Sequence, residues 1–254
     1  MSLVMVGLWL AAVGVGDLLR ASHDVVTMRR LGACLGAASA VLLVGLVLLE
    51  PGWARGLLLL ALLGGPVVAW LVTSTAALDP RRTARRRDLA RAAAFAALAV
   101  GVLTSLLGVQ AVESPLTWPG FLDHTIASRW PASDLVVAIG VVVAQLVTAN
   151  IVVRLLLDAV GVPATTNEKQ LKGGRVLGPM ERLFIVGLGA LGELTAAAIV
   201  VAAKGLLRFP ELQRAQQQQS LPTDGPSDVT EYFLIGSFAS WLIALGGAAL
   251  IYLA

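Results

Sequence analysis

The chain has 254 residues, of which 57% are hydrophobic and only 14% are charged, and its formal net charge is +3. Soluble domains carry about 25% charged residues, so this composition, with a mean hydropathy of +0.82, excludes an ordinary soluble enzyme and predicts an integral membrane protein. A single cysteine and two widely separated histidines exclude an intrachain disulfide and a His/Cys metal cluster. We therefore expect no metal and no cofactor.

Apolar runs follow one another along the chain, each close to the 20 or so residues that cross a bilayer core about 30 Å thick. We predict an all-α fold, a polytopic transmembrane helix bundle of about seven spans, because almost everything between the runs is loop. Residues 1–254 form a single integral membrane domain, with a five-helix part (1–170) and a C-terminal two-helix module (171–254) that contains a flexible loop (210–230). The seven runs are residues 3–19, 31–49, 55–75, 89–111, 133–157, 180–203 and 231–253.

Basic residues predict the orientation, because cytoplasmic loops are enriched in Lys and Arg. The first run has no basic segment before it and is followed by arginines, which is typical of an uncleaved first helix with the N-terminus outside. Seven spans then place the C-terminus in the cytoplasm and 14 of the 19 basic residues on the cytoplasmic side, in segments 20–30, 81–91 and 154–182. The Arg-over-Lys and Ala/Gly-rich usage favours the inner membrane of a bacterium. We interpret the basic run 81–87 as an orienting loop that touches lipid headgroups, not as a nucleic-acid site.

Gly64, Gly65 and Pro66 fall at the midpoint of the third run and predict a helix break or kink. Proline lacks the backbone donor, and paired glycines resist bending little. Kinks are common in membrane helices. If the first six runs form two inverted halves, however, the third and sixth runs correspond, and interrupted helices at matching places indicate a transporter site.

Glu193 lies near the middle of the run 180–203. An ionisable side chain at that depth costs about 2.5–3.5 kcal/mol to insert and normally has a partner or a task. The run 133–157 offers polar side chains at a similar depth, and Asp17 and Arg20 extend the path to the cytoplasmic end of the first run. We predict an intramembrane polar site made of Glu193, Gln145, Thr148, Asn150 and Arg154. Alternatively, these groups are interhelical hydrogen bonds worth about 0.6 kcal/mol each.

Small residues at helical spacing predict close contacts between helices. Gly32 with Gly36, and Gly236 with Ser240, form small-x-x-x-small faces. The glycines of 187–192 match a dinucleotide-binding pattern, but that pattern needs a strand before it and a helix after it. Inside an apolar run we expect them to let a neighbouring helix, water or ligand approach the backbone.

Charged and small residues of the C-terminal part occur in a characteristic order: Gly174-Arg175-Val176-Leu177-Gly178, Glu181-Arg182-Leu183, Ala202-Ala203-Lys204, Leu207-Arg208-Phe209 and Glu231-Tyr232-Phe233-Leu234-Ile235-Gly236. In these motifs the module 174–253 resembles a family of uncharacterised bacterial polytopic membrane proteins, for which no activity is established. The first 170 residues lack the His and Asp that open the first helix in that family. The resemblance implies that five charged residues belong to one module, and we expect Glu231 to pair with Lys204 or Arg208. The five structural ion-pair residues are Glu181, Arg182, Lys204, Arg208 and Glu231.

Enzyme signatures are weak. The sequence has no G-x-S-x-G, no H-E-x-x-H and no Asp-rich motif for Mg²⁺ and a diphosphate. Asp123 and His124, in the outer loop 112–132, are the best acid/base pair.

We therefore predict a membrane protein that provides a polar intramembrane site for a cation, proton or small polar solute. The alternative is a non-catalytic subunit or scaffold of a larger membrane complex, and a membrane-embedded lipid-modifying enzyme comes third. The expected partners are membrane lipids and other membrane proteins in a homo- or hetero-oligomer, with no nucleic acid.

Overall fold

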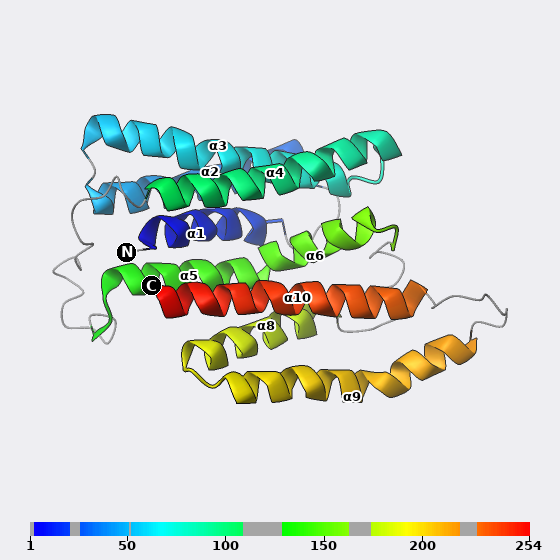
Figure 1. The fold of residues 1–254 in the computed structure, drawn as a ribbon. Coiled ribbons are helices and arrows are strands. Elements are labelled where there is room, and N and C mark those ends of the chain that lie inside the picture. Colours follow the sequence, from blue (N-terminus) through cyan, green and yellow to red (C-terminus); the bar gives the residue numbers. More distant parts are fainter. Residues whose placement is uncertain (1–2, 21–25, 51, 109–128, 163–173, 219–227) are drawn as a thin grey trace. The chain divides into compact units, whose positions relative to one another are not determined.

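The computed structural model describes residues 3–20, 26–50, 52–108, 129–162, 174–218 and 228–254, and all regular structure within these ranges is helical. The predicted all-α fold is therefore confirmed for the described part of the chain. The helices, drawn in Figure 1, are α1 (Val4–Leu18), α2 (Met28–Leu49), α3 (Trp53–Leu78), α4 (Ala84–Gly108), α5 (Ala132–Leu146), α6 (Thr148–Ala159), α8 (Gly174–Ala190), α9 (Leu194–Gln218) and α10 (Asp228–Leu253).

Several helices have the length and composition that a membrane requires. Among the described residues, α2, α3, α4 and residues 231–253 of α10 are long and apolar enough to cross a bilayer, and α5 with α6 would make a fifth span. The helix α1 is apolar but shorter. These helices indicate a membrane-embedded protein with four or five described spans, where the sequence predicted about seven. The orientation of the termini stays a prediction.

The chain divides into two compact units, residues 1–148 with 250–254, and residues 149–249. In the first unit, α1 is the central helix, with α2 and α4 on one side of it and α5 on the other (Figure 1). A helix that is apolar on all sides is normally buried on all sides, and α1 follows this rule. Met5 and Trp9 of α1 are 0% and 1% exposed.

The helices α1 and α5 approach so closely that their backbones touch. A Cβ atom added at Gly7 would lie 2.5 Å from the Cα of Val137, and one added at Gly140 would overlap the carbonyl oxygen of Gly7. Real Cβ atoms do not come so near to backbone atoms, so only glycine fits at these two positions. Small residues allow this approach and increase van der Waals contact between the helices.

The small-residue faces predicted from the sequence differ in how closely another helix packs against them. A Cβ at Gly32 or Gly36 would meet nothing within 4 Å, so the described structure contains no close packing there. A Cβ at Gly236 would make ordinary contacts with Leu157 and Val153. The glycine-rich segment 187–192 does admit a neighbouring helix, since a Cβ at Gly189 would lie 2.7 Å from that of Ala248 in α10.

Of the break or kink expected at Gly64, Gly65 and Pro66, the break does not occur, and the kink stays a prediction. The helix α3 continues from Trp53 to Leu78 with Pro66 inside it. A proline removes only one hydrogen bond of the helix, and apolar helices tolerate this when their neighbours and local adjustments satisfy the freed groups. Pro66 is itself buried, so the packing around it stabilises the continuous helix.

The predicted sixth span, 180–203, is not one helix. Helix α8 ends at Ala190, and Gly192 has a φ of +79°, which places it in the left-handed region. The N–H of Glu193 donates to the carbonyl of Leu188 at 2.8 Å, and the N–H of Gly192 donates to that of Gly189 at 3.1 Å. This pair of bonds is the Schellman motif, which ends a helix at a glycine. The helix α9 starts immediately afterwards at Leu194 and runs back beside α8 (Figure 1).

Both ends of the predicted loop 210–230 are helical. Helix α9 continues through Pro210 to Gln218, and α10 starts at Asp228. Glutamine, glutamate, leucine, arginine and alanine, which make up most of residues 211–218, are all good helix formers. The polar composition predicts a loop, whereas residues 210–218 are part of a helix. Residues 219–227 lie outside the described part of the chain.

Candidate functional site

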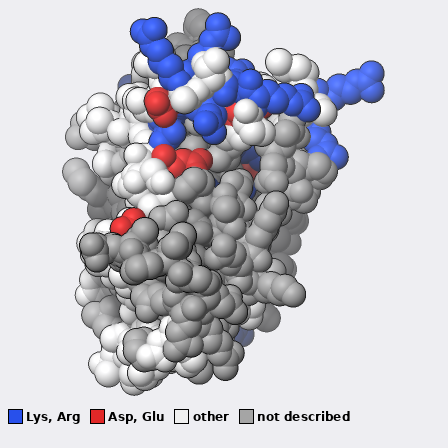
Figure 2. Space-filling view, turned by 90° about the vertical axis from the view of Figure 1, so that its right-hand side faces the viewer, with Lys and Arg blue, Asp and Glu red and all other residues white. Residues whose placement is uncertain are grey.

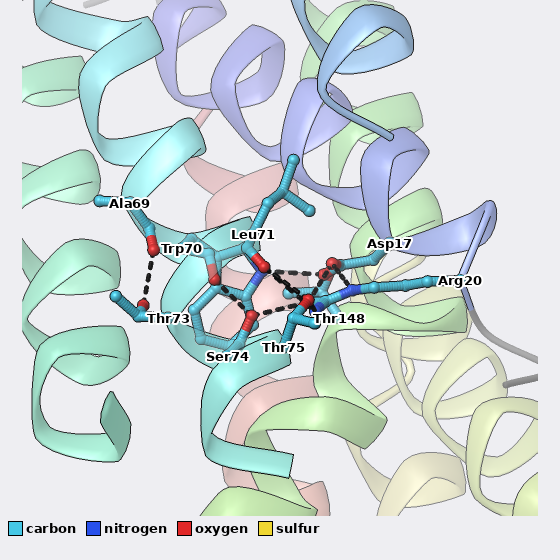
Figure 3. A network of polar contacts seen from close by, with 9 residues as sticks. All are labelled: Asp17, Arg20, Ala69, Trp70, Leu71, Thr73, Ser74, Thr75 and Thr148. Atoms are coloured by element: carbon cyan, nitrogen blue, oxygen red, sulfur yellow. Dashed lines mark hydrogen bonds and ion pairs between the residues drawn. The ribbon is translucent and has the colours of Figure 1, made fainter. Parts of the chain in front are cut away.

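A cluster of buried polar side chains lies inside the first unit, at the C-terminal end of α1. Asp17 is 0% exposed and Arg20 is 4% exposed, although both side chains are ionisable and their surroundings are largely apolar. Asp17 lies in the last turn of α1, and Arg20 follows the helix end, where its backbone N–H donates to the carbonyl of Asp17 at 3.1 Å. Figure 3 shows how side chains of α3 and the first residue of α6 converge on this pair.

The carboxylate of Asp17 accepts four hydrogen bonds. Its Oδ1 receives Nε and Nη2 of Arg20 at 2.9 and 2.5 Å. Its Oδ2 receives the indole Nε1 of Trp70 at 3.0 Å and the hydroxyl of Thr148 at 2.7 Å. A carboxylate offers about four acceptor directions, so each one is occupied.

The guanidinium of Arg20 is equally well satisfied. In addition to its two bonds to Asp17, Nη2 donates to the hydroxyl of Ser74 at 2.8 Å. The other terminal nitrogen, Nη1, donates to the hydroxyl of Thr75 at 2.7 Å and to the carbonyl of Leu71 at 3.5 Å. These bonds use all five N–H donors of an arginine.

The local conformation of α3 orients the two hydroxyls toward Arg20. Ser74 donates to the carbonyl of Trp70 and Thr75 donates to that of Leu71 at 2.6 Å, each one helical turn back. Ser and Thr often bond the i−4 carbonyl in this way. Because each hydroxyl proton is directed to the backbone, the oxygen lone pairs are left to accept from the guanidinium.

Thr148 reaches the cluster because the predicted fifth span is interrupted. The backbone at Val147 leaves the helical region, with φ −130° and ψ −51°, and Thr148 begins α6 immediately after it. Gln145 therefore lies in α5, whereas Thr148, Asn150 and Arg154 lie in α6. Gln145 and Thr148 belong to the first unit, whereas Asn150 and Arg154 belong to the second.

Comparisons with known proteins give no relative. No family model matches the chain, and no curated protein and no solved structure is similar to it. The resemblance of segment 174–253 to a bacterial membrane-protein family therefore rests on its motifs alone.

The second unit contains another buried cation. Arg182 of α8 is 1% exposed, and it donates to the side-chain oxygen of Asn150 at 2.7 Å and to the hydroxyl of Ser240 at 3.0 Å. These bonds join α8 to α6 and α10 within the unit. Asn150 was predicted as part of the Glu193 site, and Arg182 as a member of an ion pair; the structure brings the two together. The side chains of Lys204 and Arg208 lie outside the described residues, so the expected pairing with Glu231 stays a prediction.

Glu193 occupies a turn rather than the interior of a helix. It follows the left-handed Gly192, its side chain is exposed, and its carbonyl accepts the N–H of Ala197 at 3.1 Å, so it is the N-cap residue that directly precedes α9. A carboxylate at a helix N-terminus is stabilised by the helix dipole. This position accounts for an acidic residue within an apolar segment without invoking a buried site.

We expect Glu193→Gln to change the free energy of unfolding by no more than about 0.5 kcal/mol, as for most exposed positions. Glutamine keeps the size of the side chain and removes only its charge at the start of α9. Thermal unfolding of the purified protein in detergent measures this. A loss of several degrees, compared with Glu181→Gln in the same helical hairpin, would restore Glu193 as a buried group with a partner.

Sequence reasoning found some members of the Asp17 cluster and missed others. Asp17, Arg20 and Thr148 were named as parts of a polar path, but Trp70, Ser74 and Thr75 were not. An Asp three positions before an Arg inside an apolar run is a signal in itself. No group of three or more His, Cys, Asp or Glu side chains that could hold a metal occurs among the described residues. Asp123 and His124 lie outside the described ranges.

Proposed function

We propose that this chain is a bacterial inner-membrane protein that provides a polar intramembrane site for a proton, a cation or a small polar solute, with Asp17 at its centre in place of Glu193. The observation that carries this proposal is the complete burial of the Asp17 carboxylate among apolar helices. Ionisable residues inside membrane bundles are rare and usually belong to a substrate, ion or proton pathway.

The interruption at Val147 supports the same proposal. Discontinuous helices near substrate and ion sites are a recurring feature of transporters, because the free ends of the half-helices present backbone dipoles to the ligand. Here the break lies beside Thr148, whose hydroxyl contacts Asp17. The break predicted in the third run is thus replaced by one that adjoins the charged cluster.

In this proposal the Asp17–Arg20 pair is a closed state. A proton or cation reaches Asp17 only when Arg20 moves away, since all four acceptor directions of the carboxylate are filled in the structure. Neutralising Asp17 removes its attraction for Arg20, whose guanidinium then keeps only its hydrogen bonds to α3, among them those to Ser74 and Thr75. Arg20 then acts as the gate and Asp17 as the binding group.

A non-catalytic subunit of a larger membrane complex remains the second candidate, and one observation favours it. The network has no unfilled donor on Arg20 and no unfilled direction on Asp17, as expected for a cluster that only fixes the packing of α1 against α3. In this case the pair never opens, and association with partner proteins is the function.

The single cysteine provides a test that requires no guess about the solute. Cys34 is 0% exposed, and its carbonyl oxygen would lie 3.3 Å from a Cβ on Gly16, the neighbour of Asp17. We expect a small cationic thiol reagent to modify Cys34 slowly in the folded, vesicle-reconstituted protein, because a conducting site must admit water. The variant Asp17→Asn should react severalfold faster, since it frees Arg20.

The same measurement can reject the proposal. If Cys34 stays unmodified in the wild type and in folded Asp17→Asn, but reacts once the protein is unfolded in dodecyl sulfate, the cluster does not open. The variant Cys34→Ser, which has no thiol, measures the background labelling. The mass of the native complex, extracted in a mild detergent, then tests the second candidate, which predicts a heteromeric assembly.

A further inference from the structure

One end of the first unit is strongly basic. The C-terminus of α1, the N-terminus of α2 and the turn from α3 to α4 all lie at this end (Figure 1). Figure 2 looks onto this end and shows basic side chains gathered over it. We call the exposed or half-exposed arginines here the basic end; they are Arg29, Arg30, Arg81, Arg82, Arg85, Arg86, Arg87 and Arg91.

Carboxylates neutralise only a minority of these arginines. Asp79 lies 3.7 Å from Arg82, and Asp88 lies 2.8 Å from Arg91. Within the described part of the chain, the guanidinium groups of the remaining six arginines make no hydrogen bond or ion pair with a carboxylate, although the backbone N–H of Arg81 donates to Asp79 at 3.0 Å. The six are Arg29, Arg30, Arg81, Arg85, Arg86 and Arg87.

The position of the arginines along α4 adds to this excess. Arg85, Arg86 and Arg87 occupy the first turn of α4, where the helix dipole is positive and favours anions over cations. Consecutive helical positions point about 100° apart, so the three guanidiniums spread around the helix end. Repulsion among them and with the dipole decreases when an anion binds there.

Exposed apolar side chains accompany the charges. Leu89, one turn after Arg85, is 64% exposed, and Met28 beside Arg29 is 83% exposed. Arginine on the polar side and bulky apolar residues on the other is the pattern of a membrane–water interface. Because α2, α3 and α4 have the length of membrane spans, the basic end lies at the level of lipid headgroups.

We propose that the basic end binds the phosphodiester headgroups of anionic phospholipids, with the six unpaired arginines as ligands and Leu89 and Met28 in the acyl boundary. Guanidinium groups match phosphate oxygens in a bidentate manner. The apolar residues favour a lipid over a free phosphate, because a soluble anion gains nothing from them. Among the described residues, the opposite end of the unit carries two arginines, Arg55 and Arg129, and two carboxylates, Glu50 and Asp134, so it has no such excess.

Native mass spectrometry tests this with purified protein in mixed micelles containing equal amounts of phosphatidylglycerol and phosphatidylcholine. We expect selective retention of phosphatidylglycerol. The triple variant Arg85→Gln, Arg86→Gln, Arg87→Gln should retain it on the order of 100-fold more weakly, since each basic residue near such a surface contributes a factor of about five. The control Arg55→Gln, Arg129→Gln should retain it as the wild type does.

Two measurements on the wild-type protein keep the proposal open to rejection even if the triple variant does not fold. Retention of phosphatidylglycerol should fall when salt shortens the Debye length to about 3 Å at 1 M. Glycerol phosphate at the same concentration as the lipid should not displace it. Equal retention of the two lipids, salt-independent binding, or complete displacement by glycerol phosphate would each overturn the proposal, the last by indicating a soluble phosphate site.

Discussion

Replacing Asp17 by alanine is expected to lower the free energy of unfolding by about 3–5 kcal/mol, because it leaves the buried guanidinium of Arg20 without its counter-ion. The same change removes the acceptor of the Trp70 indole and of the Thr148 hydroxyl. Unpaired buried donors add to the loss. Dodecyl sulfate titration in mixed micelles, followed by circular dichroism, measures the change.

Two controls separate this effect from the loss of an ordinary salt bridge. Asp88→Ala removes the partner of Arg91 at a similar distance, but Asp88 is 66% exposed, so we expect a change of no more than about 1 kcal/mol. The double variant Asp17→Leu, Arg20→Met should be less destabilised than Asp17→Ala, because no charge remains buried without a partner. If Asp17→Ala is as mild as Asp88→Ala, the Asp17–Arg20 pair is not buried in the membrane-embedded protein.

Replacing Gly140 by alanine is expected to destabilise the protein by about 1–3 kcal/mol, the usual effect of overpacking. The added methyl group would overlap the carbonyl oxygen of Gly7 on α1, which belongs to a backbone and cannot rotate away. The helices α1 and α5 must therefore separate, and Thr148 moves away from Asp17 with them. Gly7→Ala should have a similar effect, since its Cβ would meet the backbone of Val137.

The matched controls are Gly32→Ala and Gly36→Ala in α2. A Cβ at either position meets nothing within 4 Å. Alanine is also the better helix former by about 0.8–1 kcal/mol, so these variants should be neutral or slightly stabilised in the same titration. If Gly140→Ala is equally neutral, the backbones of α1 and α5 do not touch in the folded protein, and the prediction is wrong.

Local sequence features were sufficient to predict most of the helices, but not to predict where each helix ends. Apolar runs correctly predicted α1 to α4 and α10, because an apolar run of about 20 residues rarely forms anything but a membrane-spanning helix. Pro66 was expected to interrupt α3 and does not, since buried neighbours stabilise the continuous helix. Gly192 was interpreted as a packing residue, although a glycine followed by a helix-starting carboxylate at Glu193 also has the form of a helix end. Composition alone did not distinguish the two uses of glycine.

The sequence by itself determined that this protein is helical, membrane-embedded and basic in particular segments, because hydropathy and charge are summed over neighbouring residues. Only the tertiary structure decided which ionisable group is buried. The position of Glu193 in the run 180–203 predicts a deeply buried side chain, but Glu193 lies exposed in a turn, whereas Asp17, near the end of a run, is buried. The physical reason is that burial depends on neighbours distant in sequence: the hydroxyl that reaches Asp17 belongs to Thr148, 131 positions away. Such contacts leave no periodic signal in the sequence around either residue.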